Sequence, residues 1–276
     1  MNVAATMDQA ARALARPQRI DPGVPIKVGV DLGTAVTVIA VTDQAGRPLA
    51  VVSTVADVVR DGIVWDFAGA MDVIAALAQA LEQSTGRHVG NAAVSVPPST
   101  SRADHRAHRF VLEGVGIECD AVVDEPTAAN AVLGIRDGAV VDIGGGTTGI
   151  ALLRDGAVVS TIDQPSGGTH VSLVIAGAKK LDFAAAERLK VTSARHSELL
   201  PIVRPTLEKI ATIVGEAIAG HQITQIHLVG GTAAFDGMAA IMTEVTGIPA
   251  RVAPQPMLVT PLGVASWAHP LTQGVR

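Results

Sequence analysis

Two stretches of the chain repeat one pattern of apolar and polar positions. In residues 28–41 and again in residues 140–153, an apolar strand ends in Asp, a turn of Gly and Thr follows, and a second apolar strand begins. Turn-forming residues come next, and a third apolar stretch follows at residues 49–55 and 157–162. The repeat predicts two similar strand–turn–strand–turn–strand units, packed as two α/β halves with a cleft between them.

Helical periodicity fills the intervals between these strands. Asp66 is a typical N-cap residue before an apolar stripe over residues 67–81, and Asp182 precedes a helix over residues 183–190. A longer apolar stripe over residues 202–218 predicts a third helix. Alternating strands and helices favour an α/β fold class with a mostly parallel sheet in each half. The remaining predicted strands lie at residues 91–96, 119–123 and 225–229.

The N-terminal residues differ from this body. Apolar residues between Met7 and Leu14 fall at helical spacing, and a Pro- and Gly-rich linker follows up to Pro25. Two interpretations are open: a flexible tail, or an amphipathic helix that lays its apolar face into a groove on a partner. The predicted domains are an N-terminal tail at 1–25, a first half at 26–137, a second half at 138–268 and a C-terminal tail at 269–276.

Composition narrows the class of protein. Of 276 residues, 48% are hydrophobic and 17% are charged, which supports a sizeable buried core. A net charge of −5 and an aromatic content of 2% argue against a nucleic-acid partner, which needs a basic face and stacking side chains. No apolar run reaches the ~18 residues of a membrane helix, so no membrane partner is expected. We therefore expect a cytoplasmic globular protein.

Other chemically notable side chains are interpreted as structural. His105 and His108 lie at i, i+3 without an evident third ligand, and we place them on the hydrated face of a helix. Trp65 and Trp267 are expected in the core or at a subdomain interface. Cys119, the single cysteine, is expected to be an inert core residue.

The two Gly/Thr turns carry the candidate chemistry. Consecutive backbone N–H groups in such a turn form a concavity for phosphate oxygens, and a neighbouring carboxylate can hold Mg²⁺ through water. For a single turn of this kind, a purely structural role of the Asp in forming the turn is as good an explanation as phosphate binding. Two equivalent turns, after Asp31 and Asp142, indicate a site that binds phosphates from both sides. The candidate phosphate-binding residues are Gly33, Thr34, Gly144, Gly145, Gly146 and Thr147.

These motifs resemble those of the actin/Hsp70/sugar-kinase superfamily, which has duplicated ribonuclease H-like domains with a nucleotide cleft between them. Residues 124–130 and 260–266 resemble its two connecting helices, and residues 228–232 resemble its adenosine loop. The resemblance spans roughly residues 26–268. It implies that ATP or ADP binds with Mg²⁺, which Asp31 and Asp142 would position.

The resemblance also assigns roles outside the phosphate loops. Glu125 matches a carboxylate that orients the attacking water. A purely structural role is the alternative, because an acidic residue and a Pro are both favoured in the first turn of a helix. Glu187 and Lys190 match a pair that contacts the nucleoside, with a solvated helix pair as the competing interpretation. Asp31, Glu125 and Asp142 are thus the candidate catalytic residues. The further candidate nucleotide contacts are Gly167, Gly168, Gly230 and Gly231.

A narrower resemblance lies in residues 57–67, which are similar to a segment of the ethanolamine-utilisation protein J family. That family is Hsp70-like and is encoded with ethanolamine-degrading bacterial microcompartments. The resemblance implies a chaperone that assists microcompartment assembly, or that protects or refolds ethanolamine ammonia-lyase. The implied partners are that enzyme or the shell proteins, and the implied location is the cytoplasm in association with the microcompartment.

One departure from the Hsp70 pattern bears on activity. Hsp70 chaperones use a Lys of the first half in γ-phosphate transfer, whereas residues 51–96 contain no Lys and only Arg60, Arg87 and His88 as basic side chains. Phosphoryl transfer depends on positioned positive charge, so we expect slow or absent ATP hydrolysis. Two alternatives stay open: a non-enzymatic actin-like scaffold and a small-molecule kinase.

Overall fold

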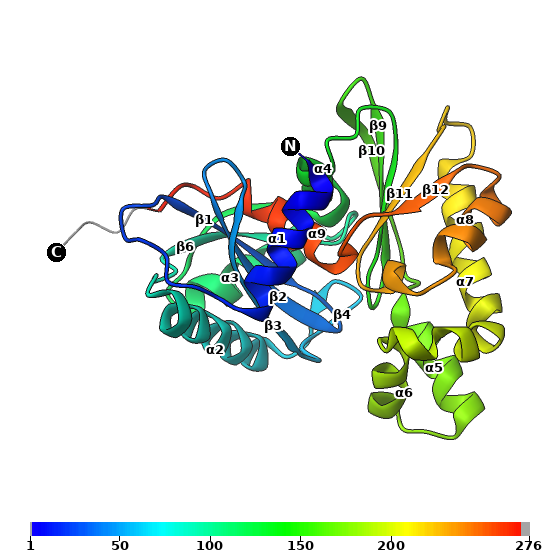
Figure 1. Cartoon of the computed structure of the whole chain (residues 1–276), viewed down its shortest axis with the longest axis horizontal. Helices are drawn as coiled ribbons and strands as arrows, with labels where there is room; N and C mark the ends of the chain where they lie inside the picture. The colour runs from blue at the N-terminus through cyan, green and yellow to red at the C-terminus, as the bar shows by residue number, and fades with distance from the viewer. Residues whose placement is uncertain (1, 272–276) are drawn as a thin grey trace. The chain divides into compact units, whose positions relative to one another are not determined.

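The structure is a computed structural model that describes residues 2–271, and the chain forms two compact units (Figure 1). The first unit combines the chain up to Gly134 with the segment from Leu258 onward. The second unit consists of Ile135–Met257. Each unit contains its own five-stranded sheet and its own hydrophobic core.

This division corrects the predicted halves at 26–137 and 138–268, because most of the last helix belongs to the first unit. That helix, α9 (Pro256–Ala265), packs backbone to backbone against the first strand of the chain. A Cβ on Gly29 would stand 2.4 Å from the backbone N of Ala265, so only glycine permits this approach.

The first unit is an α/β structure around one mixed sheet. Its elements are β1 (Ile26–Leu32), β2 (Val36–Asp43), β3 (Pro48–Val55), β4 (Val59–Arg60), β5 (Ile63–Val64), α2 (Phe67–Thr85), β6 (Asn91–Val96), α3 (Arg102–Gly114), β7 (Glu118–Asp124) and α4 (Glu125–Leu133). The sheet order is β3-β2-β1-β6-β7, and β4 and β5 form a separate hairpin. Ile74 and Leu81 of α2 and Leu112 of α3 share one buried core with Val28 and Ile39 of the sheet.

The second unit repeats this arrangement. Its elements are β8 (Gly138–Ile143), β9 (Thr148–Arg154), β10 (Ala157–Gln164), α5 (Gly168–Lys179), α6 (Phe183–Lys190), η1 (Ser193–Arg195), α7 (His196–Ile218), β11 (Ile226–Val229), η2 (Thr232–Ala234), α8 (Met238–Thr246) and β12 (Ala250–Val252). The sheet order is β10-β9-β8-β11-β12, the counterpart of the first sheet. Val171 of α5 and Leu207 of α7 pack with Val141 and Ile150 of the sheet. The predicted duplication is confirmed.

Both sheets are mixed rather than mostly parallel. In each, the first three strands in sequence pair antiparallel and the other two pairings are parallel. The reason lies in the short turns that join those three strands, because a parallel connection needs a crossover of a dozen or more residues. The turn between Asp43 and Pro48, which joins β2 to β3, is far shorter than that.

The predicted helices at Asp66 and Asp182 begin as expected. The Asp66 carboxylate accepts a hydrogen bond from Gly69 N at 2.9 Å, and the Asp182 carboxylate accepts one from Ala185 N at 2.7 Å. The predicted helix at 202–218 starts earlier, at His196. Pro201 gives the appearance of a helix start, but the structure accommodates it inside α7.

Residues near the N-terminus form a helix on the first unit, not a flexible tail. α1 (Val3–Ala15) begins at Asn2, whose side chain accepts from Ala5 N, and Met7 and Ala10 on it are fully buried. Gln9 Nε2 donates to the carbonyl of Pro48, the first residue of β3, at 2.8 Å. The apolar face of α1 is therefore used within this chain rather than offered to a partner's groove.

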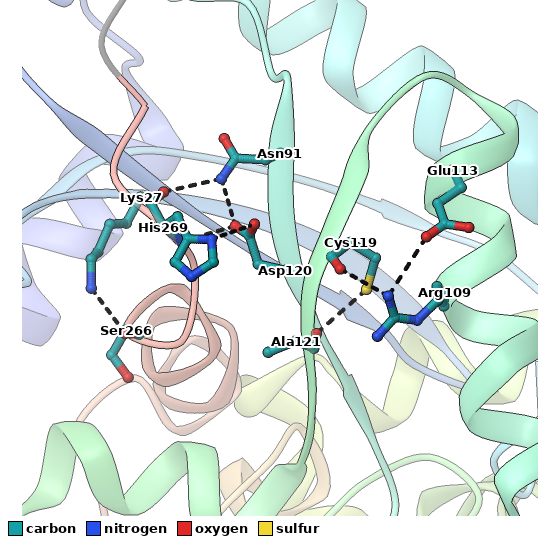
Figure 2. Close-up of polar contacts among 9 residues, drawn as sticks. All are labelled: Lys27, Asn91, Arg109, Glu113, Cys119, Asp120, Ala121, Ser266 and His269. Atoms are coloured by element: carbon teal, nitrogen blue, oxygen red, sulfur yellow. Dashed lines mark hydrogen bonds and ion pairs between the residues drawn. The ribbon is translucent and has the colours of Figure 1, made fainter.

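The predicted C-terminal tail at 269–276 also begins as ordered structure, and residues 272–276 lie outside the described part. Figure 2 shows the Asp120 carboxylate, which accepts from Asn91 Nδ2 at 2.5 Å and from His269 N at 2.8 Å. Ile26 and Leu271 exchange two backbone hydrogen bonds beyond this point. The segment after α9 thus contacts β7 and β6 and then pairs with the start of β1, the central strand of the first sheet.

Three interpretations of single residues need correction or support. His108 is fully buried rather than hydrated, and its Nδ1 lies 2.9 Å from the Asp104 carbonyl. Trp65 and Trp267 are about half exposed, at 50% and 46%, rather than in the core. Cys119 is buried, and burial raises the pKa of its thiol, which is consistent with an inert residue.

Among the described residues, no helix combines the length and apolar character needed to cross a membrane.

Candidate functional site

The candidate site of the second unit starts at the turn between β8 and β9. Asp142, at the end of β8, is only 5% exposed. The turn closes through a hydrogen bond from Gly144 N to Thr147 O at 3.0 Å. Gly144, Gly145, Gly146 and Thr147 therefore form one compact loop, as the sequence predicted, directly after the buried carboxylate.

The N-terminus of α5 is attached to this loop. Gly168 N donates to Gly144 O at 2.9 Å, and Thr169 N donates to Gly145 O at 2.8 Å. No side chain caps α5, and Ser166 Oγ just before it is buried without a partner in the described part of the chain. The Gly144 and Gly145 carbonyls thus occupy the first N–H groups of α5, and the helix favours an anion such as phosphate at this loop through its dipole.

Glu187 and Lys190 on α6 form an ion pair in which Lys190 is buried and Glu187 is partly buried, so the interpretation as a solvated helix pair is wrong. Lys190 Nζ lies 2.7 Å from Glu187 Oε2 and donates to Gly168 O at 3.2 Å. Ser172 Oγ of α5 donates to the same Glu187 carboxylate. Burial lowers the pKa of Lys190, with the Glu187 carboxylate acting in the opposite direction. The pair fixes α6 against the start of α5.

The loop after β11 completes this set. Gly230 has φ +89, and a Cβ there would stand 2.3 Å from Asp142 Oδ1 and 2.5 Å from Ile143 O. Thr232 Oγ1 donates to Gly144 O at 2.8 Å. The structure therefore brings Gly230 and Gly231 to the same place as Asp142 and the Gly144–Thr147 loop.

The first unit holds the remaining predicted residues at the carboxyl ends of its parallel strands. Asp31 lies near the end of β1 and accepts a hydrogen bond from Ser95 Oγ of β6 at 2.8 Å. Burial raises the pKa of Asp31 to about 6, and the Ser95 hydrogen bond opposes this shift. Gly33 and Thr34 follow in the β1–β2 turn.

Glu125 lies at the same sheet edge, as the first residue of α4 after β7. Its predecessor Asp124 caps the helix by accepting from Thr127 N at 2.9 Å. β7 is parallel to β6, and β6 to β1, so the ends of these strands share one edge of the sheet. Helix-start chemistry at Asp124 is thus confirmed, and the role of Glu125 in orienting water stays a prediction.

No all-protein metal cage is present in the described residues, since no three or more His, Cys, Asp or Glu side chains gather as possible metal ligands. Single carboxylates such as Asp31 and Asp142 suit Mg²⁺, which usually keeps several waters and takes one or two carboxylates plus phosphate oxygens. Each of these carboxylates, taken within its own unit, is chemically suited to hold Mg²⁺ through water.

Several residues that build the site were missed by sequence reasoning. Ser95, Ser172 and His196 carried no local motif, and each acts on a partner in a different element. Thr232 could have been found, because it directly follows the Gly230–Gly231 pair in the predicted adenosine loop.

Two duplicated α/β units with glycine loops at strand ends define an actin-like fold, and comparison with known proteins agrees. Family models for cell division protein FtsA and for MreB/Mbl protein match residues 139–263 and 46–180. MreB5 of Spiroplasma citri bound to ADP has a TM-score of 0.70 at 16% identity, covering 86% of this chain and 94% of that chain.

Closer relatives identify the family. Ethanolamine utilization protein EutJ of Escherichia coli K12 is 40% identical over 252 residues, 91% of this chain and 89% of the relative. The crystal structure of EutJ from Carboxydothermus hydrogenoformans has a TM-score of 0.91 at 42% identity, covering 97% of this chain and 99% of that chain. The chain belongs to the EutJ family of ethanolamine utilization proteins.

Proposed function

We propose that this protein binds ATP and ADP with Mg²⁺ and acts as a nucleotide-controlled accessory protein of ethanolamine utilisation. The observation that carries the nucleotide proposal is the glycine-rich Gly144–Thr147 loop beside Asp142, which is held by hydrogen bonds against the N-terminus of α5. The ADP-bound MreB5 neighbour supports it, because its fold is the same.

The proposed roles follow from chemistry at each position. The loop N–H groups would hold phosphate oxygens and the α5 dipole would favour their charge, while Asp31 and Asp142, each in its own unit, are carboxylates that could hold the waters of Mg²⁺. Bound Mg²⁺ would neutralise phosphate charge. Glu125 would orient a water molecule, and the backbone at Gly230 and Gly231 would accept the flat face of the base because no side chain covers it.

We propose that hydrolysis is slow. Arg60 and Arg87, the basic side chains that could replace the absent Lys, are engaged elsewhere. Arg60 forms two hydrogen bonds to Asp57 at 3.0 and 3.2 Å and stacks 4.1 Å from the Trp65 ring. Arg87 is fully buried and donates to backbone carbonyls, including that of Val24 at 2.7 Å. Slow turnover suits a switch, in which nucleotide shifts the population between two conformations of different affinity for a client.

The client is proposed from the family alone. Relatives at 38–40% identity carry the name ethanolamine utilization protein EutJ. We propose a chaperone-like role in the cytoplasm, for ethanolamine ammonia-lyase or for shell proteins of a bacterial microcompartment. Co-purification from ethanolamine-grown cells, with ATP or ADP present, would test it; recovery of neither partner under either condition would contradict it.

A non-enzymatic scaffold is the second candidate. The observation in its favour is the absence of Lys from residues 51–96. It predicts assembly that is the same with ATP, with a non-hydrolysable analogue and without nucleotide. Sedimentation under the three conditions distinguishes it from the switch, which requires a difference between nucleotide states.

Calorimetric titration tests the nucleotide proposal. MgADP and MgATP are titrated into the parent protein, into Asp142→Ala and into Asp72→Ala, a control that removes an exposed carboxylate on α2. We expect Mg-dependent binding to the parent and to Asp72→Ala and a large loss of affinity in Asp142→Ala, because a carboxylate that orders Mg²⁺ waters has no substitute. Phosphate release in the same samples measures turnover. Absence of binding to the parent, or equal affinity in Asp142→Ala, would contradict the proposal.

A further inference from the structure

A ring of hydrogen bonds links the segments of the second-unit site, namely the loop after β8, the helices α5, α6 and α7, and the loop after β11. Gly144 O accepts from Gly168 N at 2.9 Å and from Thr232 Oγ1 at 2.8 Å. Gly168 O accepts in turn from Lys190 Nζ at 3.2 Å. The phosphate loop is thereby connected directly to the start of α5 and to the loop after β11, and through α5 to α6.

His196 closes the series. It is the first residue of α7 and is only 3% exposed. Its Nε2 lies 2.7 Å from Lys190 O, and its Nδ1 accepts a hydrogen bond from Asp236 N at 3.0 Å. A neutral imidazole that accepts at Nδ1 carries its proton at Nε2, so one tautomer satisfies both contacts.

Packing holds the ring in this orientation. The imidazole stacks on Phe235 with ring centroids 4.1 Å apart. The Phe235 N–H donates to Thr232 O at 3.1 Å, which returns the series to the residue that contacts Gly144. His196 is thus the link between the C-terminal end of α6 and the loop Gly230–Asp236.

We propose that His196 is a positioning residue for nucleotide binding, holding the loop Gly230–Asp236 and Lys190 at a fixed distance from the phosphate loop. The inference rests on the proposed nucleotide function. The candidate phosphate contacts and the candidate nucleoside contacts lie on different segments, so their spacing determines whether one ligand reaches both. Preorganised spacing raises affinity, because binding then orders less of the protein.

Four variants separate positioning from general stability. His196→Phe keeps an aromatic ring for stacking but removes both hydrogen bonds. His196→Gln keeps an amide that can donate to Lys190 O, and His196→Asn keeps an acceptor near the Nδ1 position for Asp236 N. Leu207→Ala removes a fully buried side chain from the same helix and serves as a control for lost stability away from these contacts.

The first measurement is amide hydrogen exchange of the proteins without nucleotide. We expect His196→Phe to exchange faster in residues 230–236 and around Lys190, with α8 unchanged, and His196→Asn to restore protection near Asp236. Leu207→Ala should not single out these segments. Exchange in residues 230–236 that is the same in His196→Phe and the parent would overturn the inference, whether or not nucleotide binds.

The second measurement is the affinity for MgADP by calorimetry. We expect His196→Phe to bind about tenfold more weakly than the parent, on the order of one hydrogen bond, and Leu207→Ala to bind as the parent does. Equal affinities of His196→Phe and the parent would overturn the positioning role while leaving the nucleotide proposal intact. If the parent protein does not bind MgADP, the proposed nucleotide function is refuted. The exchange data then test only whether His196 holds the loop Gly230–Asp236 in place.

Discussion

Replacing Gly230 by Ala tests how tightly the loop after β11 fits against the end of β8. Gly230 has φ +89, a conformation that costs roughly 1–2 kcal/mol for a residue with a Cβ. The new Cβ would stand 2.3 Å from Asp142 Oδ1 and 2.5 Å from the carbonyl oxygen of Ile143. Overpacking of this kind costs about 1–3 kcal/mol, so the two effects together predict about 2–5 kcal/mol of lost stability.

Gly231→Ala is the matched control, because a Cβ there meets nothing within 4 Å and the φ of −62 suits any residue. Chemical denaturation followed by hydrogen exchange in the second unit measures the loss of stability. We expect Gly230→Ala to lose both stability and MgADP affinity, and Gly231→Ala to keep stability but lose affinity, since its Cβ would meet the bound base. Equal stability of the two variants would refute the reasoning about this loop.

Three further predictions concern charged and titratable groups. Because the pKa of Asp31 is raised to about 6 in the folded state, its contribution to wild-type stability in Mg²⁺-free buffer should fall as pH rises from about 4 to about 6. Asp31→Asn should remove this contribution and gain up to about 3 kcal/mol of stability above pH 6 relative to the wild type. A stability difference between the two proteins that stays constant across this pH range in chemical denaturation would contradict the prediction. Burial lowers the pKa of His108, so the folded state binds fewer protons than the unfolded state; stability should decline as pH falls below about 6.5, and His108→Gln should show a smaller decline in the same denaturation series. Lys190→Met leaves the partly buried Glu187 carboxylate with its Ser172 hydrogen bond but without its ion-pair partner, and should cost about 1–3 kcal/mol. Lys190→Met/Glu187→Gln should recover part of the loss, and additive costs in this double-mutant cycle would argue against a coupled pair.

The duplicated fold and the two Gly/Thr turns were predictable from the sequence because both depend on local patterns. Apolar strands that end in Asp before a Gly/Thr turn mark the loop at Gly144–Thr147 directly, and N-cap residues mark helix starts at Asp66 and Asp182. The mixed sheets were also predictable in principle, since the turn between Asp43 and Pro48 is too short for a parallel crossover.

Long-range contacts account for what the sequence did not show. Ser95 and Asp31 are 64 residues apart, and Asp236 and His196 are 40 residues apart, so only the folded sheet and loops bring them together. Trp65 is half exposed and stacks with Arg60, a contact that no hydrophobicity pattern reveals. The helical spacing near Met7 predicted an amphipathic helix but not that it packs on this chain's own β3.

Hydrogen exchange with and without MgADP tests the central claim most directly, that nucleotide binds at the loop assembled by β8, α5 and the segment after β11. We predict slower exchange in residues 144–147, 167–169 and 230–236 when MgADP is present, with α8 unchanged, and no such protection in Asp142→Ala. Unchanged exchange in all three segments of the parent protein, or protection confined to other parts of the chain, would contradict it.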